Sequence, residues 1–82
     1  MKFTDHDRDY TMTRAEGPNG DIMTLELVAT REQKVVAKIA YLGVGREFTI
    51  SVFEQDLPLT VVERLISSAS IALLPVMKLH GL

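Results

Sequence analysis

With 82 residues and 46% hydrophobic content, the chain is long enough for one small domain and too apolar to be disordered. It has no cysteine, which excludes a disulfide framework and a thiolate metal site. A net charge of −2, scattered basic residues and the lack of tryptophan argue against nucleic-acid binding. The apolar runs are too short to cross a bilayer and the first residues are acidic, so we expect a cytoplasmic protein without membrane contact.

Residues 1–8 are predicted to form a flexible acidic tail, followed by a single domain over residues 9–82. In this tail Asp5, Asp7 and nearby Asp9 surround His6. Their spacing matches no closed coordination loop for a divalent ion. The sequence therefore predicts neither a metal site nor a cofactor.

The first predicted strand covers residues 9–14, where Tyr10 and Met12 alternate with polar side chains. Its polarity is typical of an edge strand. The loop over residues 16–20 is rich in glycine, but it lacks the lysine and the following helix that a phosphate-binding loop needs. We therefore interpret this segment as a plain turn between strands.

Residues 21–30 and 34–42 each alternate apolar and polar side chains, which predicts a β-hairpin. If Thr30 pairs with Lys34, the inward-facing residues of the two strands meet each other. The same register sets Glu26 opposite Lys38 on the other face, an attractive charge pair. The apolar pairs predicted by this register are Ala29 with Val35, Leu27 with Ala37 and Leu25 with Ile39.

A turn around residues 43–45, of either two or four residues, leads to the fourth predicted strand over residues 46–54. Its alternation turns Phe48, Ile50 and Val52 inward. Either turn length keeps these three side chains on the same face as the rest of the expected core.

The segment from Leu57 to Met77 has the periodicity of an amphipathic helix. Asp56 is predicted to be its N-cap, with Pro58 in the first turn. Pro75 is expected to end or kink the helix near Leu74. The expected apolar stripe consists of Val61, Val62, Leu65, Ile66, Ala69, Ala72, Leu73 and Val76.

These elements predict an α+β fold, a four-stranded antiparallel meander sheet with one C-terminal helix packed on one face. The expected core combines the inward side chains of the strands with the helix stripe. Its members are Tyr10, Met12, Met23, Leu25, Leu27, Val35, Ala37, Ile39, Phe48, Ile50, Val52, Val62, Leu65, Ile66, Ala69 and Leu73.

The second half of the helix carries more apolar side chains than one buried stripe requires. On one interpretation the C-terminal residues fold back and cover this surplus. On the other, a second subunit or a different protein covers it. The contact residues in that second case are Ile71, Leu74, Met77 and Leu79.

The sheet face away from the helix is also mixed, with Val36 and Phe53 beside Lys38. It is either an ordinary half-exposed face or a modest binding face, since β-branched residues favour strands wherever they lie. Glu47 and Glu54 lie at its rim. Together with the aspartates of the tail, they are candidates to imitate the phosphates of a nucleic acid toward a protein that binds one.

The sequence offers no catalytic constellation, because its two histidines lie near opposite ends and its serines have no nucleophile motif. We therefore expect a small non-enzymatic protein-binding module, homodimeric, acting as an adaptor or as an inhibitor of a larger protein machine. Phages and other mobile elements encode many inhibitors of this size. The alternative is a binder of small molecules or nucleic acids that uses the open sheet face.

Overall fold

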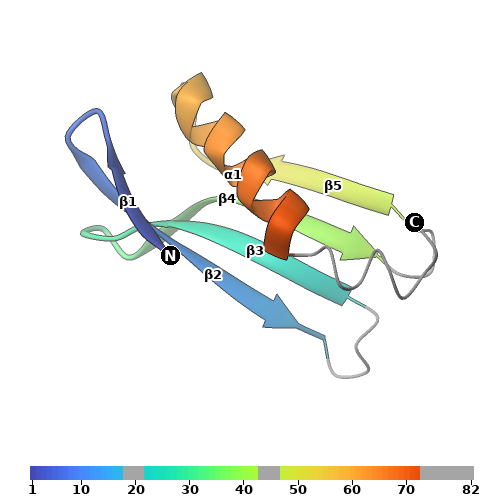
Figure 1. Cartoon of the computed structure of the whole chain (residues 1–82). Coiled ribbons are helices and arrows are strands. Elements are labelled where there is room, and N and C mark those ends of the chain that lie inside the picture. The colour runs from blue at the N-terminus through green and yellow to red at the C-terminus, as the bar shows by residue number, and fades with distance from the viewer. Residues whose placement is uncertain (18–21, 43–46, 73–82) are drawn as a thin grey trace.

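The computed structural model describes residues 1–17, 22–42 and 47–72. It forms an antiparallel sheet with a C-terminal helix packed across one face, which confirms the predicted α+β class (Figure 1). The strands lie in the sheet in the order of the chain. The elements are β1 (Lys2–Asp5), β2 (Arg8–Glu16), β3 (Ile22–Ala29), β4 (Lys34–Leu42), β5 (Glu47–Val52) and α1 (Leu59–Ala72).

The sheet has five strands rather than the predicted four, because Lys2–Asp5 forms β1. The Met12 N–H donates to the Met1 carbonyl oxygen at 2.7 Å, which ties the beginning of the chain to β2. His6 and Asp7 join β1 to β2 with φ angles of 52° and 59°. Positive φ at both residues is the geometry of a tight hairpin turn. Apart from its single aromatic residue β1 is polar, so alternation did not reveal it.

The predicted register of the central hairpin is confirmed over most of its length. Leu25 pairs with Ile39, Leu27 with Ala37, and Glu26 with Lys38. The connection differs from the prediction: Ala29 pairs with Lys34, so the loop has four residues, 30–33, instead of three.

A β-bulge at Val36 absorbs this difference. Leu27 still pairs with Ala37, but Val28 pairs with Val35, so β4 carries one extra residue at this point. Val36 and Ala37 are both fully buried in the core, whereas Val35 is only half-buried. The prediction that Val36 faces the open side of the sheet and Val35 the core is therefore wrong.

The helix α1 begins at Leu59, two residues later than predicted. Asp56 is not its N-cap: it lies in the preceding turn with a φ of 59°. The Pro58 carbonyl oxygen accepts the first helical hydrogen bonds, from the N–H groups of Val61 and Val62 at 3.0 and 3.2 Å. The predicted helix end near Leu74 lies outside the described residues, as does the turn over residues 43–46.

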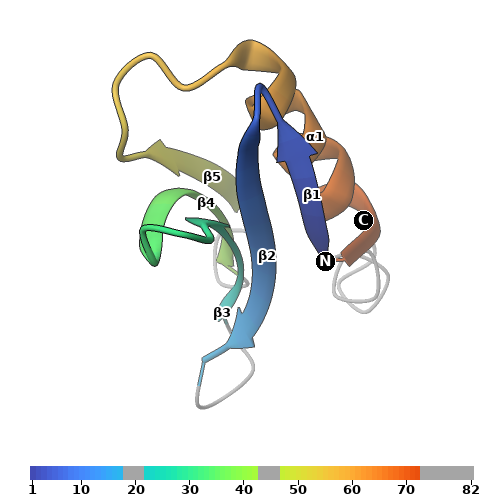
Figure 2. The ribbon, with the colours of Figure 1, turned by 90° about the vertical axis from the view of Figure 1, so that its left-hand side faces the viewer.

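The core lies between α1 and the sheet. Val61, Leu65 and Ala69 recur every four residues along α1 and are its buried side chains. The sheet curls so that β1 comes to lie beside α1, as Figure 2 shows. The buried apolar cluster is Tyr10, Met12, Met23, Leu25, Leu27, Ala29, Val36, Ala37, Ile39, Tyr41, Val61, Leu65 and Ala69.

Candidate protein-binding surface

On the face of the sheet that carries α1, the helix leaves strand β5 uncovered. The helix packs on β3 and β4, while β1 closes its other flank (Figures 1 and 2). Phe48, Ile50 and Val52 point to the same face as the core but remain 42%, 47% and 50% exposed. The prediction that these three residues belong to the core is therefore wrong.

An apolar groove runs between β5 and α1, with a volume of about 300 Å³. Ile39 and Ala69 form its floor, because both are buried. Ile66, which was predicted to be core, is half exposed on the helix side of the groove. The lining residues are Ile39, Phe48, Thr49, Ile50, Ile66, Ala69 and Ser70.

Ile71 lies on the opposite flank of α1 and is 75% exposed. It borders a second hollow of about 240 Å³ between α1 and strands β2 and β3, together with Met12, Leu25 and Ser68. The other three residues predicted to share its contact, Leu74, Met77 and Leu79, lie outside the described residues. The structure thus places Ile71 away from the groove.

On the open face of the sheet, Phe53 is 53% exposed. The Lys38 ammonium lies 6.0 Å from the centre of its ring, at the outer limit of a cation–π contact. Val36, the third residue predicted for this face, is buried and cannot contribute to it. This face therefore keeps one aromatic side chain and one cation of the predicted binding set.

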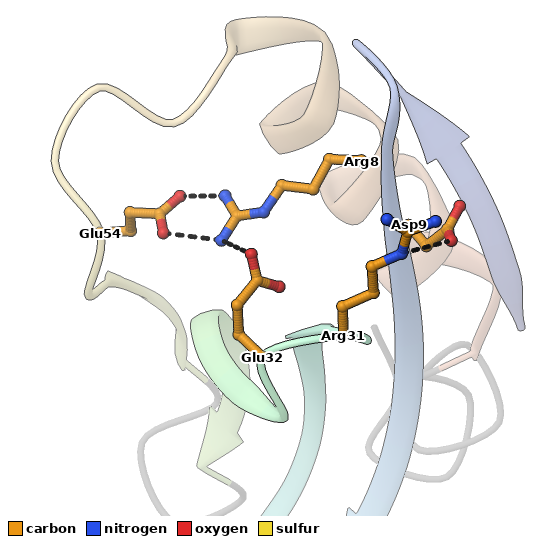
Figure 3. Close-up of polar contacts among 5 residues, drawn as sticks. All are labelled: Arg8, Asp9, Arg31, Glu32 and Glu54. Carbon is orange, nitrogen blue, oxygen red and sulfur yellow. Dashed lines mark hydrogen bonds and ion pairs between the residues drawn. The ribbon is translucent and has the colours of Figure 1, made fainter.

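Arg8 links three connecting segments at one end of the sheet (Figure 3). It follows the β1–β2 turn and contacts Glu32 in the β3–β4 loop and Glu54 between β5 and α1. Its guanidinium donates two hydrogen bonds to the Glu54 carboxylate, at 2.5 and 2.9 Å. It also forms an ion pair with Glu32 at 3.4 Å. Glu54, predicted to be part of an acidic rim, is thus neutralised within the chain, whereas Glu47 is exposed at the start of β5.

The bidentate contact changes the acidity of both partners. The hydrogen bonds from Arg8 lower the pKa of Glu54 below its ordinary value of 4.5, although partial burial acts in the opposite direction. The same contact with Glu54 raises the pKa of Arg8. The ion pair is therefore fully formed at neutral pH.

Replacing Glu54 with glutamine is expected to lower the free energy of unfolding by about 1–2 kcal/mol near neutral pH, because a charge-assisted bidentate contact is lost. Since the folded-state pKa of Glu54 lies below the unfolded value, its contribution is complete above pH 4.5 and disappears as the pH falls through the folded pKa. Urea unfolding across a pH series should therefore show the stabilities of the wild-type protein and of Glu54→Gln converging as the pH falls from 4.5 through the lowered folded-state pKa of Glu54.

Glu32→Gln is the matched control for this series. Glu32 is half exposed and forms only the longer ion pair with Arg8, so its loss should cost less than about 0.5 kcal/mol. If the loss in free energy of unfolding caused by Glu54→Gln stayed the same at acidic pH, the stabilising role of the Arg8–Glu54 ion pair would be contradicted.

Asp5 and Asp9, two of the three aspartates near the beginning of the chain, also have partners. Asp5 contacts His6, and this hydrogen bond lowers the pKa of Asp5. The Thr4 hydroxyl donates to Asp9 at 2.7 Å. Across residues 1–17, 22–42 and 47–72 no group of three His, Cys, Asp or Glu side chains is arranged to hold a metal ion.

Sequence reasoning missed the groove because alternation marks the inward side of a strand but not whether anything covers that side. Phe48, Ile50 and Ile66 follow the same pattern as buried residues. A comparison of widths would have found them. One helix is about 10–12 Å across and neighbouring strands are about 4.8 Å apart, so a single helix covers only two or three strands of a sheet.

Comparison of the chain with models of protein families, with curated proteins and with solved structures finds no match in any of the three. Within the described residues, no helix has the length and apolar character to span a bilayer.

Proposed function

We propose that this protein is a small non-enzymatic protein-binding module whose contact surface is the groove between β5 and α1. The observation that carries the proposal is the convergence of Phe48, Ile50 and Ile66, all half exposed, on one apolar hollow. Contiguous exposed apolar surface of this kind is typical of protein contacts, whereas single exposed apolar residues are not informative.

The geometry suits an extended or helical segment of a partner. The groove is open along its length, and its volume lies at the lower end of the range for small-molecule pockets. A partner side chain placed over Ala69 would contact Ile66 on one side and Ile50 on the other. An adaptor and an inhibitor of a larger machine would both need a surface of this type.

The open face of the sheet supports the alternative function, binding of a small molecule or nucleic acid, less well. Its exposed aromatic residue, Phe53, offers a single ring with the Lys38 ammonium 6.0 Å from its centre, and no second aromatic residue is among those predicted for this face. A hollow of about 320 Å³ lies beside β1 and β2, where polar residues such as Lys2, Thr4 and Asp9 help to line it, but neither Lys38 nor Phe53 belongs to it.

Ile66→Lys tests the proposal. A charge in the middle of the groove should weaken binding of a purified partner at least tenfold, since truncating a central apolar contact commonly costs 2 kcal/mol or more. The partner would be captured by cross-linking to the wild-type protein, purified, and titrated by calorimetry against each variant.

Ile71→Lys is the matched control, because it adds the same charge on the same helix but outside the groove. It should leave the affinity unchanged. Equal binding by the wild-type protein and both variants would contradict the groove as the contact site, and weakening only by Ile71→Lys would move the contact to the other flank of α1.

A further inference from the structure

The strand β5 is also an edge of the sheet. It differs from the other edge strand because both its outer backbone edge and its face toward α1 are uncovered by the described elements. The other edge strand, β1, has only four residues, carries Lys2 and Asp5, and lies beside α1 (Figure 2). Short, charged edge strands resist pairing with other chains. In β5 the run from Phe48 to Val52 contains no charge, proline or glycine, and no described element lies beyond it (Figure 1).

The hydrogen bonds to β4 determine which backbone groups of β5 face outward. The Phe53 N–H donates to the Val36 carbonyl oxygen at 2.8 Å, so the backbone groups of Phe53 point toward β4. Along an antiparallel strand these groups alternate in direction from residue to residue. The N–H and C=O groups of Phe48, Ile50 and Val52 therefore point toward the open edge.

We propose that β5 pairs with β5 of a second copy of this chain, antiparallel and about a two-fold axis at Ile50, which joins the two sheets into one. This deepens the proposed function, on which it rests, by naming a partner for the β5 side of the groove. In this register Ile50 faces Ile50 of the second copy, and Phe48 faces Val52. Each outward-pointing N–H and C=O group of the three residues then finds a partner.

The side chains support the same register. On the face that carries α1, the cross-strand pairs are Phe48 with Val52 and Ile50 with Ile50, aromatic and β-branched combinations that stabilise sheets. On the other face Thr49 meets Ser51, two hydroxyl side chains. A two-fold axis at Thr49 would pair Phe48 with Ile50 but set Val52 opposite a residue before β5. An axis at Ser51 would pair Ile50 with Val52 but set Phe48 opposite Glu54, so in both cases one apolar residue would lack an apolar partner.

Charge is complementary at the ends of this contact. The register sets Glu47 of one copy opposite Phe53 of the other, and the Lys38 ammonium lies 6.0 Å from the centre of that ring. The exposed Glu47 carboxylate thus approaches a cation of the second copy. On the face with α1, the two grooves become neighbours across the paired strands.

The closing experiment measures the solution mass by light scattering over a concentration series. The wild-type protein should reach twice its chain mass of 9.1 kDa and dissociate on dilution. Val52→Pro removes one outward N–H but no hydrogen bond to β4, so it should raise the dimer dissociation constant at least tenfold. Val52→Thr retains that N–H and should remain dimeric. A wild-type protein that is monomeric throughout would overturn the proposal.

A charge exchange at Ile50 tests the register and does not depend on how proline is tolerated. Ile50→Lys and Ile50→Glu should each be monomeric, because the axis sets like charges opposite each other. An equimolar mixture should form a heterodimer. Failure of the mixture to associate, although the wild-type protein does, would overturn the axis at Ile50.

Two helix variants distinguish this proposal from the groove as a binding site. Ile66→Lys and Ile71→Lys should both remain dimeric, since neither residue belongs to the β5 edge. Loss of the dimer in Ile71→Lys but not in Val52→Pro would place the interface on the helix and overturn edge pairing. A dimer that persists while partner binding is insensitive to Ile66→Lys would contradict only the groove.

Discussion

Val36→Lys is expected to unfold the protein, whereas Val35→Lys should leave it folded with a loss of less than about 1 kcal/mol. Val36 is fully buried within the cluster that packs under α1. A lysine there would carry its charge into the core, or displace the side chains around it. Because a domain of this size has a stability of only about 4–12 kcal/mol, such a change removes most of it.

Val35 differs because the bulge turns it to the open face, where it is half-buried beside Val28. A lysine at this position can lay its aliphatic stem along the sheet and keep its ammonium group in water. Circular dichroism and urea unfolding of the two variants would distinguish a β4 strand with the bulge at Val36 from one without it. The reverse order, with Val35→Lys unfolded and Val36→Lys stable, would mean an unbroken ladder without the bulge.

Phe3→Ala should lower the free energy of unfolding by about 2–3 kcal/mol, less than for a fully buried phenylalanine because Phe3 is half-buried. Its ring stacks on Tyr10 with centroids 5.2 Å apart, and the Arg64 guanidinium lies 4.7 Å from its centre. The variant thus loses an aromatic pair and a cation–π contact that join β1 to β2 and α1.

Lys2→Ala is the control for this change, since Lys2 is exposed on the same strand and should cost less than about 0.5 kcal/mol. Chemical denaturation followed by circular dichroism measures both values. If residues 1–8 formed a mobile tail, Phe3→Ala and Lys2→Ala would be equally neutral.

The elements with strong alternation were predictable from the sequence. The four inward residues of β3 are all buried, and three of the pairs predicted between β3 and β4 are present because hydrophobic alternation and the Glu26–Lys38 pair required the same register. The amphipathic stripe of α1 was correct around Val61, Leu65 and Ala69.

The bulge and the first strand could not be predicted, for different physical reasons. Val35, Val36 and Ala37 are all apolar, so burying either valine satisfies the pattern equally well, and only the four-residue loop decides between them. In β1 the stabilising side chain is Phe3, and one aromatic residue in a polar segment does not establish a period.

The candidate surface was partly predictable. The sequence shows more apolar side chains than one helix–sheet core can bury. Its pattern, however, places this surplus at the end of the helix and on the open face of the sheet. The structure adds β5, where Phe48 and Ile50 lack a cover within the described residues. Which strand remains uncovered depends on where β1 packs, and the sequence did not reveal β1.

The position of β1 beside α1 has a consequence for the order in which the chain folds. Each strand pairs with its neighbour in the sequence, so the sheet can form through successive short loop closures. Arg8 and Glu54, by contrast, are 46 residues apart, and Phe3 meets Arg64. During synthesis, β1 and β2 leave the ribosome before α1, so the contact between the Phe3 ring and Arg64 can form only after the helix has been made.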